Sequence, residues 1–382
     1  MSRIDGKEKN WGSRSGKSKI KDPNTFSLLD KLKFQGLSDD LIEFAASDPV
    51  VFSQLAQEII ASKSNLLIKS QSTKLKEVFN TQLGKLYNGD CINLLSSDLI
   101  ENNSLDCIFA DPPFNLSKDY GNRVGDQFTD EEYLEWTRLW LDLCIKKLKN
   151  GGSFFIYNIP KWSTYIAHYL NQSLVLKNWI AVDLTLSMPI PNRLYPSHYS
   201  LLYFVKGGKP NHFSPPRVPL KTCVRCGKEQ NDYGGYKNKM NPEGLNLRDV
   251  WIDIPPVRHI KYKNRDANEL SIKLLERVLD IATQEGDLVF DPFGGGGTTY
   301  VAAEITGRRW IGVELGDTKP IIDRFKNNED DLKLIEKYHR EINTLFTDAA
   351  LAKRFKHNIP VGPYRVNEEQ LKRIDSNLNL LH

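Results

Sequence analysis

Short apolar runs alternate with helix-length amphipathic segments in two parts of this chain, residues 83–205 and 268–315. Runs such as Leu105–Ala110 predict buried strands, whereas Glu131–Leu148 places its apolar side chains on one broad helical face and is expected to end at Asn150–Gly152. Because parallel neighbouring strands must be joined by crossovers, the alternation predicts a mostly parallel sheet with helices on both faces. The predicted fold class is therefore α/β.

The remaining segments differ from these two parts in composition. Residues 1–25 are polar and basic, which predicts a disordered tail, with a DNA-contacting arm as the alternative. Residues 26–82 carry helix N-cap signals and predict a helical appendage, and residues 326–382 predict a helical extension. Residues 206–263 have weak periodicity and hold twelve Lys and Arg against five Asp and Glu, which predicts a basic, loop-rich insert.

The bulk composition limits the class of protein. A net charge of +4 permits nucleic-acid binding without requiring it. Most of the five cysteines lie in apolar runs, which is typical of a reduced intracellular protein. Cys223 and Cys226 have the spacing of half a zinc site, but no second C-x-x-C pair exists, and we predict no metal site. No apolar stretch is long enough for a membrane span or signal peptide, so we expect a cytoplasmic protein.

A glycine-rich string follows the apolar run Asp287–Phe290 and precedes a predicted helix. It reads Asp291-Pro-Phe-Gly-Gly-Gly-Gly-Thr-Thr299, and it allows a ligand to approach backbone amides at a helix N-terminus. A P-loop is excluded because no Lys follows Gly297. Glu314, at the end of the next strand, could bind the ribose hydroxyls of a dinucleotide or of S-adenosylmethionine, so both cofactors stay open, as does a purely structural turn.

A second string, Asp111-Pro-Pro-Phe114, ends the run Leu105–Ala110. Its prolines remove two amide donors, so the loop carbonyls and the Asp111 carboxylate can only accept hydrogen bonds. Such acceptors suit an exocyclic –NH₂ group and orient its lone pair towards an electrophilic methyl group. Phe114 offers a ring for stacking, and a base in a duplex must flip out to reach it. The structural alternative is an exit from a strand that is turned by proline.

Together and in this order, the two strings resemble those of the amino-directed DNA methyltransferases of the β group, over residues 83–325. The resemblance implies S-adenosylmethionine as cofactor. It also implies a Rossmann-like class I methyltransferase fold, whose mostly parallel seven-stranded sheet has its last strand antiparallel. Residues 83–205 would be the catalytic half, residues 206–263 the target-recognition region, and residues 264–325 the cofactor-binding half.

The resemblance also implies roles for single residues. The catalytic set is Asp111, Pro112, Pro113 and Phe114. The cofactor-binding set is Asp90 near the adenine, Asp291 near the methionine amino group, Phe293, Gly295 and Gly297 of an F-x-G-x-G pattern, and Glu314 at the ribose. The chain departs from the family where Lys263–Leu270 replaces a His-Pro-Thr-Gln-Lys-Pro string, and where Gly296 replaces a common Ser. No cofactor contact is assigned to Lys263–Leu270.

The function predicted on this basis is site-specific methylation of adenine N6 in DNA by a bacterial or phage restriction–modification enzyme. Asp at the first position of the catalytic string is associated with adenine; cytosine N4 is the alternative base. A catalytically inactive DNA-binding module is the rival from another class, and a nicotinamide dehydrogenase is a more distant one. The expected partner is double-stranded DNA. The resemblance also allows a cognate restriction endonuclease and a homodimer, associated with the nucleoid and not with a membrane.

Overall fold

The computed structural model describes part of the chain. The described residues are 74–116, 128–184, 191–192, 194–218, 234, 245–254, 269–341 and 356. The predicted tail at 1–25, most of the appendage at 26–82, and both Cys223 and Cys226 lie outside the described residues.

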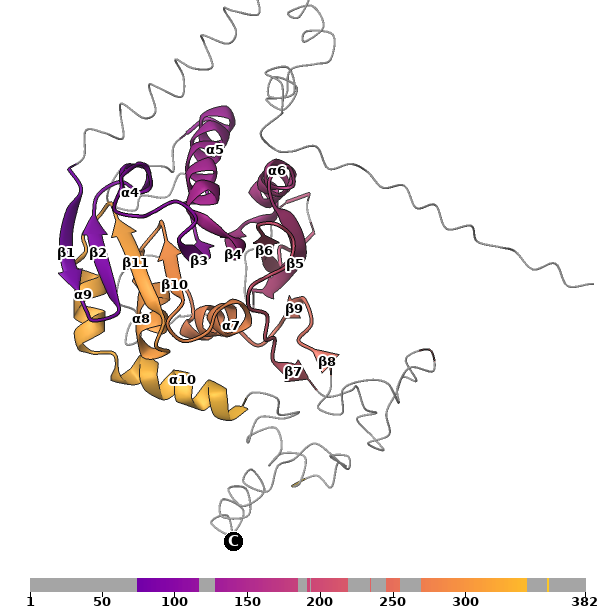
Figure 1. Cartoon of the computed structure of the whole chain (residues 1–382). Helices are drawn as coiled ribbons and strands as arrows, with labels where there is room; N and C mark the ends of the chain where they lie inside the picture. The colour runs from indigo at the N-terminus through magenta and orange to yellow at the C-terminus, as the bar shows by residue number, and fades with distance from the viewer. Residues whose placement is uncertain are drawn as a thin grey trace, which may run out of the picture. The chain divides into compact units, whose positions relative to one another are not determined.

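Nine of the described strands form one sheet, in the order β1-β2-β11-β10-β3-β4-β6-β5-β9 (Figure 1). These strands are β1 Lys76–Asn80, β2 Gly84–Asn88, β3 Leu105–Ala110, β4 Leu148–Asn158, β5 Val175–Asp183, β6 His198–Val205, β9 Val250–Trp251, β10 Leu288–Asp291 and β11 Arg309–Glu314. Two further short strands, β7 Arg217–Val218 and β8 Leu245–Asn246, pair with each other within the predicted recognition region.

Helices cover both faces of this sheet (Figure 1). One layer comprises α4 Cys91–Ser96, α5 Asp130–Lys147 and α6 Pro160–Leu170; the other comprises α7 Ile272–Ala282, α8 Thr298–Ile305, α9 Lys319–Lys326 and α10 Glu329–Glu341. Successive residues of β3 point to opposite layers, so Phe109 packs in the core beside α7 and α8, and Ile108 packs in the core beside α5 and α6. Among the described helices, none has the length and apolar character needed to cross a bilayer.

The seven-stranded sheet that we predicted is confirmed as the centre of the larger one. Strands β2, β11, β10, β3 and β4 are consecutive parallel neighbours. Strand β6, the last of the predicted catalytic half, runs antiparallel between β4 and β5, while β5 runs in the common direction. Strands β1 and β9 extend this sheet at its two edges.

The predicted helical character of residues 26–82 is wrong for Lys76–Asn80, which form β1 antiparallel to β2. The Thr81 hydroxyl accepts hydrogen bonds from the backbone amides of Leu83 and Gly84, which turns the chain back into β2. Phe79 then packs its ring 5.1 Å from that of Phe325 on α9. Because the Thr81 side chain closes a turn directly after Lys76–Asn80, this segment forms a hairpin with β2 and does not continue a helix.

Gly84, the first residue of β2, lies against β11 with no room for a side chain. A Cβ atom there would be 2.2 Å from Cδ2 of buried Trp310 and 2.4 Å from its carbonyl oxygen. We expect Gly84→Ala to lower the free energy of unfolding by about 3 kcal/mol, measured by urea denaturation. Gly286→Ala is the control, because its φ of +84° is strained but its Cβ would meet open space; it should cost only about 1 kcal/mol. Equal losses in both variants would contradict the steric argument.

Candidate active site

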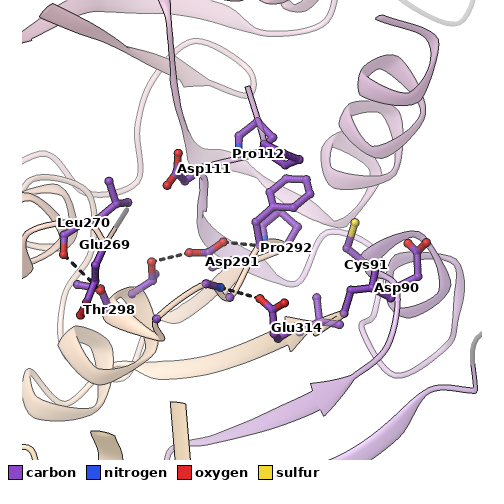
Figure 2. A pocket seen from close by; sticks show the side chains of 18 of the residues that line it. Asp90, Cys91, Asp111, Pro112, Glu269, Leu270, Asp291, Pro292, Thr298 and Glu314 are labelled. Carbon is purple, nitrogen blue, oxygen red and sulfur yellow. Dashed lines mark hydrogen bonds between the residues drawn. The ribbon is translucent and has the colours of Figure 1, made fainter. Parts of the chain in front are cut away.

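The two sequence strings meet at one edge of the sheet because β3 and β10 are parallel neighbours, with Phe290 opposite Ile108. From β3 the chain crosses through α5 to β4, whereas from β10 it crosses through α8 to β11 on the other side. Open α/β sheets bind ligands at such a change of direction, outside the carboxyl ends of the strands. Asp111 directly follows β3 and Asp291 ends β10, so both lie at this crevice (Figure 2).

A cavity of about 190 Å³ occupies the crevice. All members of the predicted catalytic and cofactor-binding sets line it, except Gly297. Gly297 is the N-cap residue of α8 and has a φ of +75°, and a Cβ atom there would lie 2.7 Å from Cγ2 of Ile321 on α9. Glycine at this position therefore lets the loop turn closely over α9.

Several residues that line the cavity were not predicted from the sequence. These include Cys91, Trp136, Glu269, Leu270, Thr298 and Thr299. Trp136 belongs to the apolar face of α5, so in the sequence it cannot be told from a core residue. Glu269 and Leu270 come from the stretch to which no contact was assigned, and Glu269 lies so near the loop that a Cβ atom on Gly296 would be 3.2 Å from its Cγ.

The glycine loop is held by Glu314 at the end of β11. Oε2 of Glu314 accepts a hydrogen bond from the Gly295 amide at 2.7 Å, and Oε1 accepts one from the Gly316 amide at 2.8 Å. The Gly297 amide donates to the Gly294 carbonyl at 2.7 Å, which closes the turn before α8. One carboxylate thus joins the glycine loop to the segment after β11 and faces the cavity (Figure 2).

Asp291, the last residue of β10, is a buried acid at the cavity. Its Oδ1 accepts from the Phe293 amide at 2.9 Å, and its Oδ2 accepts from the Thr299 hydroxyl at 2.5 Å. Burial nevertheless raises the pKa of this carboxyl well above its usual range, and the nearby charges of Asp111 and Glu314 raise it further. A cation that entered the cavity beside Asp291 would stabilise its ionised form.

The lining of the cavity is strongly acidic. It includes Asp90, Asp111, Glu269, Asp291 and Glu314, and no Lys or Arg lines it among the residues that the structure describes. Such a site repels phosphate groups and attracts a positively charged ligand. The lining therefore disfavours the dinucleotide that the sequence left open, and it suits a cofactor that carries a sulfonium and an ammonium group.

Two aromatic donors fix the loop after β3. The Tyr133 hydroxyl donates to the Pro113 carbonyl at 2.8 Å, and Nε1 of Trp162 donates to the Phe114 carbonyl at 2.7 Å. Within the described residues no hydrogen bond reaches the Pro112 carbonyl. The Pro112 carbonyl and the Asp111 carboxylate both lie at the cavity, whereas the carbonyls of Pro113 and Phe114 already accept hydrogen bonds from Tyr133 and Trp162.

Phe114 lines the cavity, and its ring belongs to a small aromatic group. Its centroid lies 5.5 Å from that of Tyr199 and 6.5 Å from that of Tyr157. Burial raises the pKa of both tyrosines, and the charge of Asp111 adds to the effect, so both phenols stay neutral at ordinary pH. The group gives the loop a rigid apolar support.

Asp90 reaches the cavity as the N-cap of α4, where its side chain accepts from the Ile92 amide at 2.8 Å. The preceding residues tie β2 to β11, since the Gly89 amide and the Asn88 side chain both donate to the Glu314 carbonyl at 3.0 Å. Asp90 and Glu314 are therefore set at fixed positions on neighbouring strand ends.

A separate acidic group lies between α7 and α10, away from the cavity. Glu276, Asp280 and His339 bring their ligand atoms within 4.8 Å of one another. Nε2 of His339 lies 2.8 Å from Glu276, and Arg308 pairs with Asp280 at 3.1 Å. We assign no metal to this group.

Comparison with known proteins places this site in a family. A family model described as DNA methylase matches residues 105–319, which is more than half of the chain. The chain belongs to this DNA methylase family. The matched range includes both strings and Glu314.

Individual relatives support this membership. The type II methyltransferase M.BamHI of Bacillus amyloliquefaciens is 54% identical over 260 residues, which are 68% of this chain and 62% of the relative. The type II methyltransferase M.HpaI of Haemophilus parainfluenzae is 30% identical over 222 residues, which are 56% of this chain and 66% of the relative. The chain thus spans less than two thirds of the length of either relative. The solved PvuII DNA methyltransferase (cytosine-N4-specific) aligns at a TM-score of 0.49 with 20% identity, covering 71% of this chain and 96% of that one.

Proposed function

We propose that this chain transfers a methyl group from S-adenosylmethionine to the exocyclic amine of a base in double-stranded DNA. The observation that carries the proposal is the meeting of an acceptor-only loop and an acidic, glycine-lined crevice in one cavity. Membership of the DNA methylase family and the names of the relatives support it.

The residues present fit the cofactor. S-adenosylmethionine supplies, when bound, an electrophilic methyl group on a positively charged sulfonium. Asp291 would hold the methionine ammonium, because burial leaves its carboxyl in need of a positive partner. Glu314 would bind the ribose and Asp90 would lie near the adenine, while the N-terminus of α8 would suit the methionine carboxylate.

The loop after β3 would prepare the amine for reaction. The Asp111 carboxylate and the Pro112 carbonyl accept its two hydrogens, and this localises a lone pair that is otherwise delocalised into the ring. Phe114 stacks with the flipped base. Orientation and electrostatic stabilisation each contribute several kcal/mol in comparable reactions.

The proposed target is adenine N6 at a specific DNA sequence, within a restriction–modification system. Asp111 predicts adenine N6, and the basic region at 206–263 would read a specific sequence through phosphate and base-edge contacts. A restriction–modification role adds a cognate endonuclease as a partner. A homodimer and a location in the cytoplasm belong to the same proposal.

A labelling experiment tests the function directly. The full chain is incubated with unmethylated duplex DNA and cofactor labelled in its methyl group, and the DNA is then digested to nucleosides for mass analysis. We expect label in one modified nucleoside, whose mass identifies adenine N6 or cytosine N4. Cofactor and DNA binding without any labelled nucleoside would instead establish an inactive binding module.

A further inference from the structure

Arg324 on α9 is buried directly behind the glycine loop, with only 5% of its side chain exposed. Its Nη1 donates to three groups at the cavity wall: Oε1 of Glu269 at 2.5 Å, Oγ1 of Thr298 at 2.7 Å and the Gly296 carbonyl at 3.2 Å. All three of these residues line the cavity, whereas Arg324 itself does not. The guanidinium can therefore influence a ligand only through the residues that it holds.

The other side of the same guanidinium is fixed by α10. Nε donates to Oδ2 of Asp331 at 2.7 Å and Nη2 donates to Oδ1 at 2.9 Å, which is a two-pronged contact. Arg324 and Asp331 both lie beyond residue 319, where the family match ends. This support for the cavity is thus built from a part of the chain that the family pattern does not describe.

The packing around Arg324 leaves little freedom to the loop. Ile321, from the same helix, lies so close to Gly297 that a Cβ atom there would be 2.7 Å from its Cγ2. The Glu269 side chain is only 1% exposed and faces the guanidinium, which provides its counter-charge inside the protein. Helix α9 therefore braces the glycine loop at Gly296, Gly297 and Thr298.

We propose that Arg324 is a positioning residue that holds the glycine loop and the first residue of α8 in the arrangement that receives the cofactor. This inference rests on the proposed function, because it assigns the loop to S-adenosylmethionine. Lys cannot replace Arg324, since an ammonium offers no planar fork to meet Asp331 and the loop at the same time. Because Asp331 lies on α10, its contact with Arg324 makes this helix part of the support of the cofactor site.

The test uses the full chain and a matched buried arginine as control. Arg308 is 9% exposed and donates to Asp280, Thr283 and Thr306, none of which lines the cavity. Arg324→Lys and Arg308→Lys therefore remove similar networks in different places. The measurements are the KM for S-adenosylmethionine and the kcat of methyl transfer to duplex DNA, the Kd of S-adenosylhomocysteine by calorimetry, and the Tm.

We expect Arg324→Lys to raise both KM and Kd about tenfold while kcat at saturating cofactor stays nearly unchanged. Arg308→Lys should lower the Tm comparably and leave KM and Kd unchanged. The proposal is overturned if the two variants change Kd equally, or if Arg324→Lys lowers kcat alone.

If Arg324→Lys does not fold, Asp331→Asn provides the test, because it keeps the arginine and weakens only its contact with Asp331. A higher Kd in Asp331→Asn supports the proposal, and an unchanged Kd overturns it. If the wild type transfers methyl groups and Arg324→Lys has the same KM and Kd as the wild type, only this inference is overturned. A wild-type chain that neither binds cofactor nor transfers methyl groups overturns the proposed function as well.

Discussion

Asp111→Ala is expected to reduce methyl transfer to duplex DNA by about a thousandfold, the scale on which loss of one preorganised polar group acts. The variant removes the carboxylate that would accept a hydrogen bond from the target amine. The Pro112 carbonyl alone cannot hold both hydrogens, because the neighbouring carbonyls are bound by Tyr133 and Trp162. The rate is measured by label incorporation at saturating cofactor and DNA.

Two controls give this result its meaning. Asp130→Ala removes an exposed carboxylate that pairs with Lys161 at the start of α5, and it should leave the rate unchanged. Calorimetry on Asp111→Ala should show that S-adenosylhomocysteine still binds, since Asp111 is assigned to the base and not to the cofactor. Loss of cofactor binding together with activity would show that the catalytic assignment of Asp111 is wrong.

Glu314→Ala should weaken cofactor binding by at least about a hundredfold. The Glu314 carboxylate accepts from the amides of Gly295 and Gly316, so its removal leaves two donors without their acceptor and frees the glycine loop. The proposed contacts to the ribose are lost in the same variant. The measurement is the Kd of S-adenosylhomocysteine, with the Tm recorded to confirm folding.

Glu314→Gln provides the graded comparison. A glutamine keeps one oxygen acceptor and the shape of the side chain but turns the other oxygen into a donor group that faces an amide. Its Kd should lie between those of the wild type and Glu314→Ala. Wild-type affinity in Glu314→Ala would exclude this residue from the cofactor site, whatever happened to the rate.

Much of the fold was predictable because its signals are local. The apolar run Leu105–Ala110 is the observed β3, and the amphipathic stretch after it is α5 within a residue at each end. Asp111 and Asp291 could be placed together because parallel strands end at a common edge, whatever their separation in sequence. The candidate site follows from that rule and from the residue types at the two strand ends.

The features that escaped prediction depend on partners far away in the chain. Asn150–Gly152 were expected to end α5, but they lie inside β4. Leu105 pairs with Leu148 while Cys107 pairs with Ser153, so the extra residues of β4 bulge out of the ladder there. Glycine permits a helix end and a bulge equally, and only the neighbouring strand decides between them.

The same limit applies to the cavity wall. The contact of Glu269 with Arg324 forms only when α9 packs behind the glycine loop, and no local pattern in either segment announces it. Charged residues in a polar stretch are more often solvated than buried, so sequence reasoning leaves such pairs unassigned. Sequence motifs therefore identify the residues that would contact the ligands more readily than the residues that hold those in place.

The contact between Gly296 and Glu269 links the two positions at which this chain departs from the pattern of the family it resembles. A Cβ atom at position 296 would lie 3.2 Å from Cγ of Glu269, which is closer than an ordinary van der Waals contact. The two departures therefore meet in space, and a residue larger than glycine at position 296 would require the Glu269 side chain to move by a few tenths of an ångström. In this chain the wall of the crevice beside Gly296 is thus formed by a buried acid whose counter-charge is the guanidinium of Arg324.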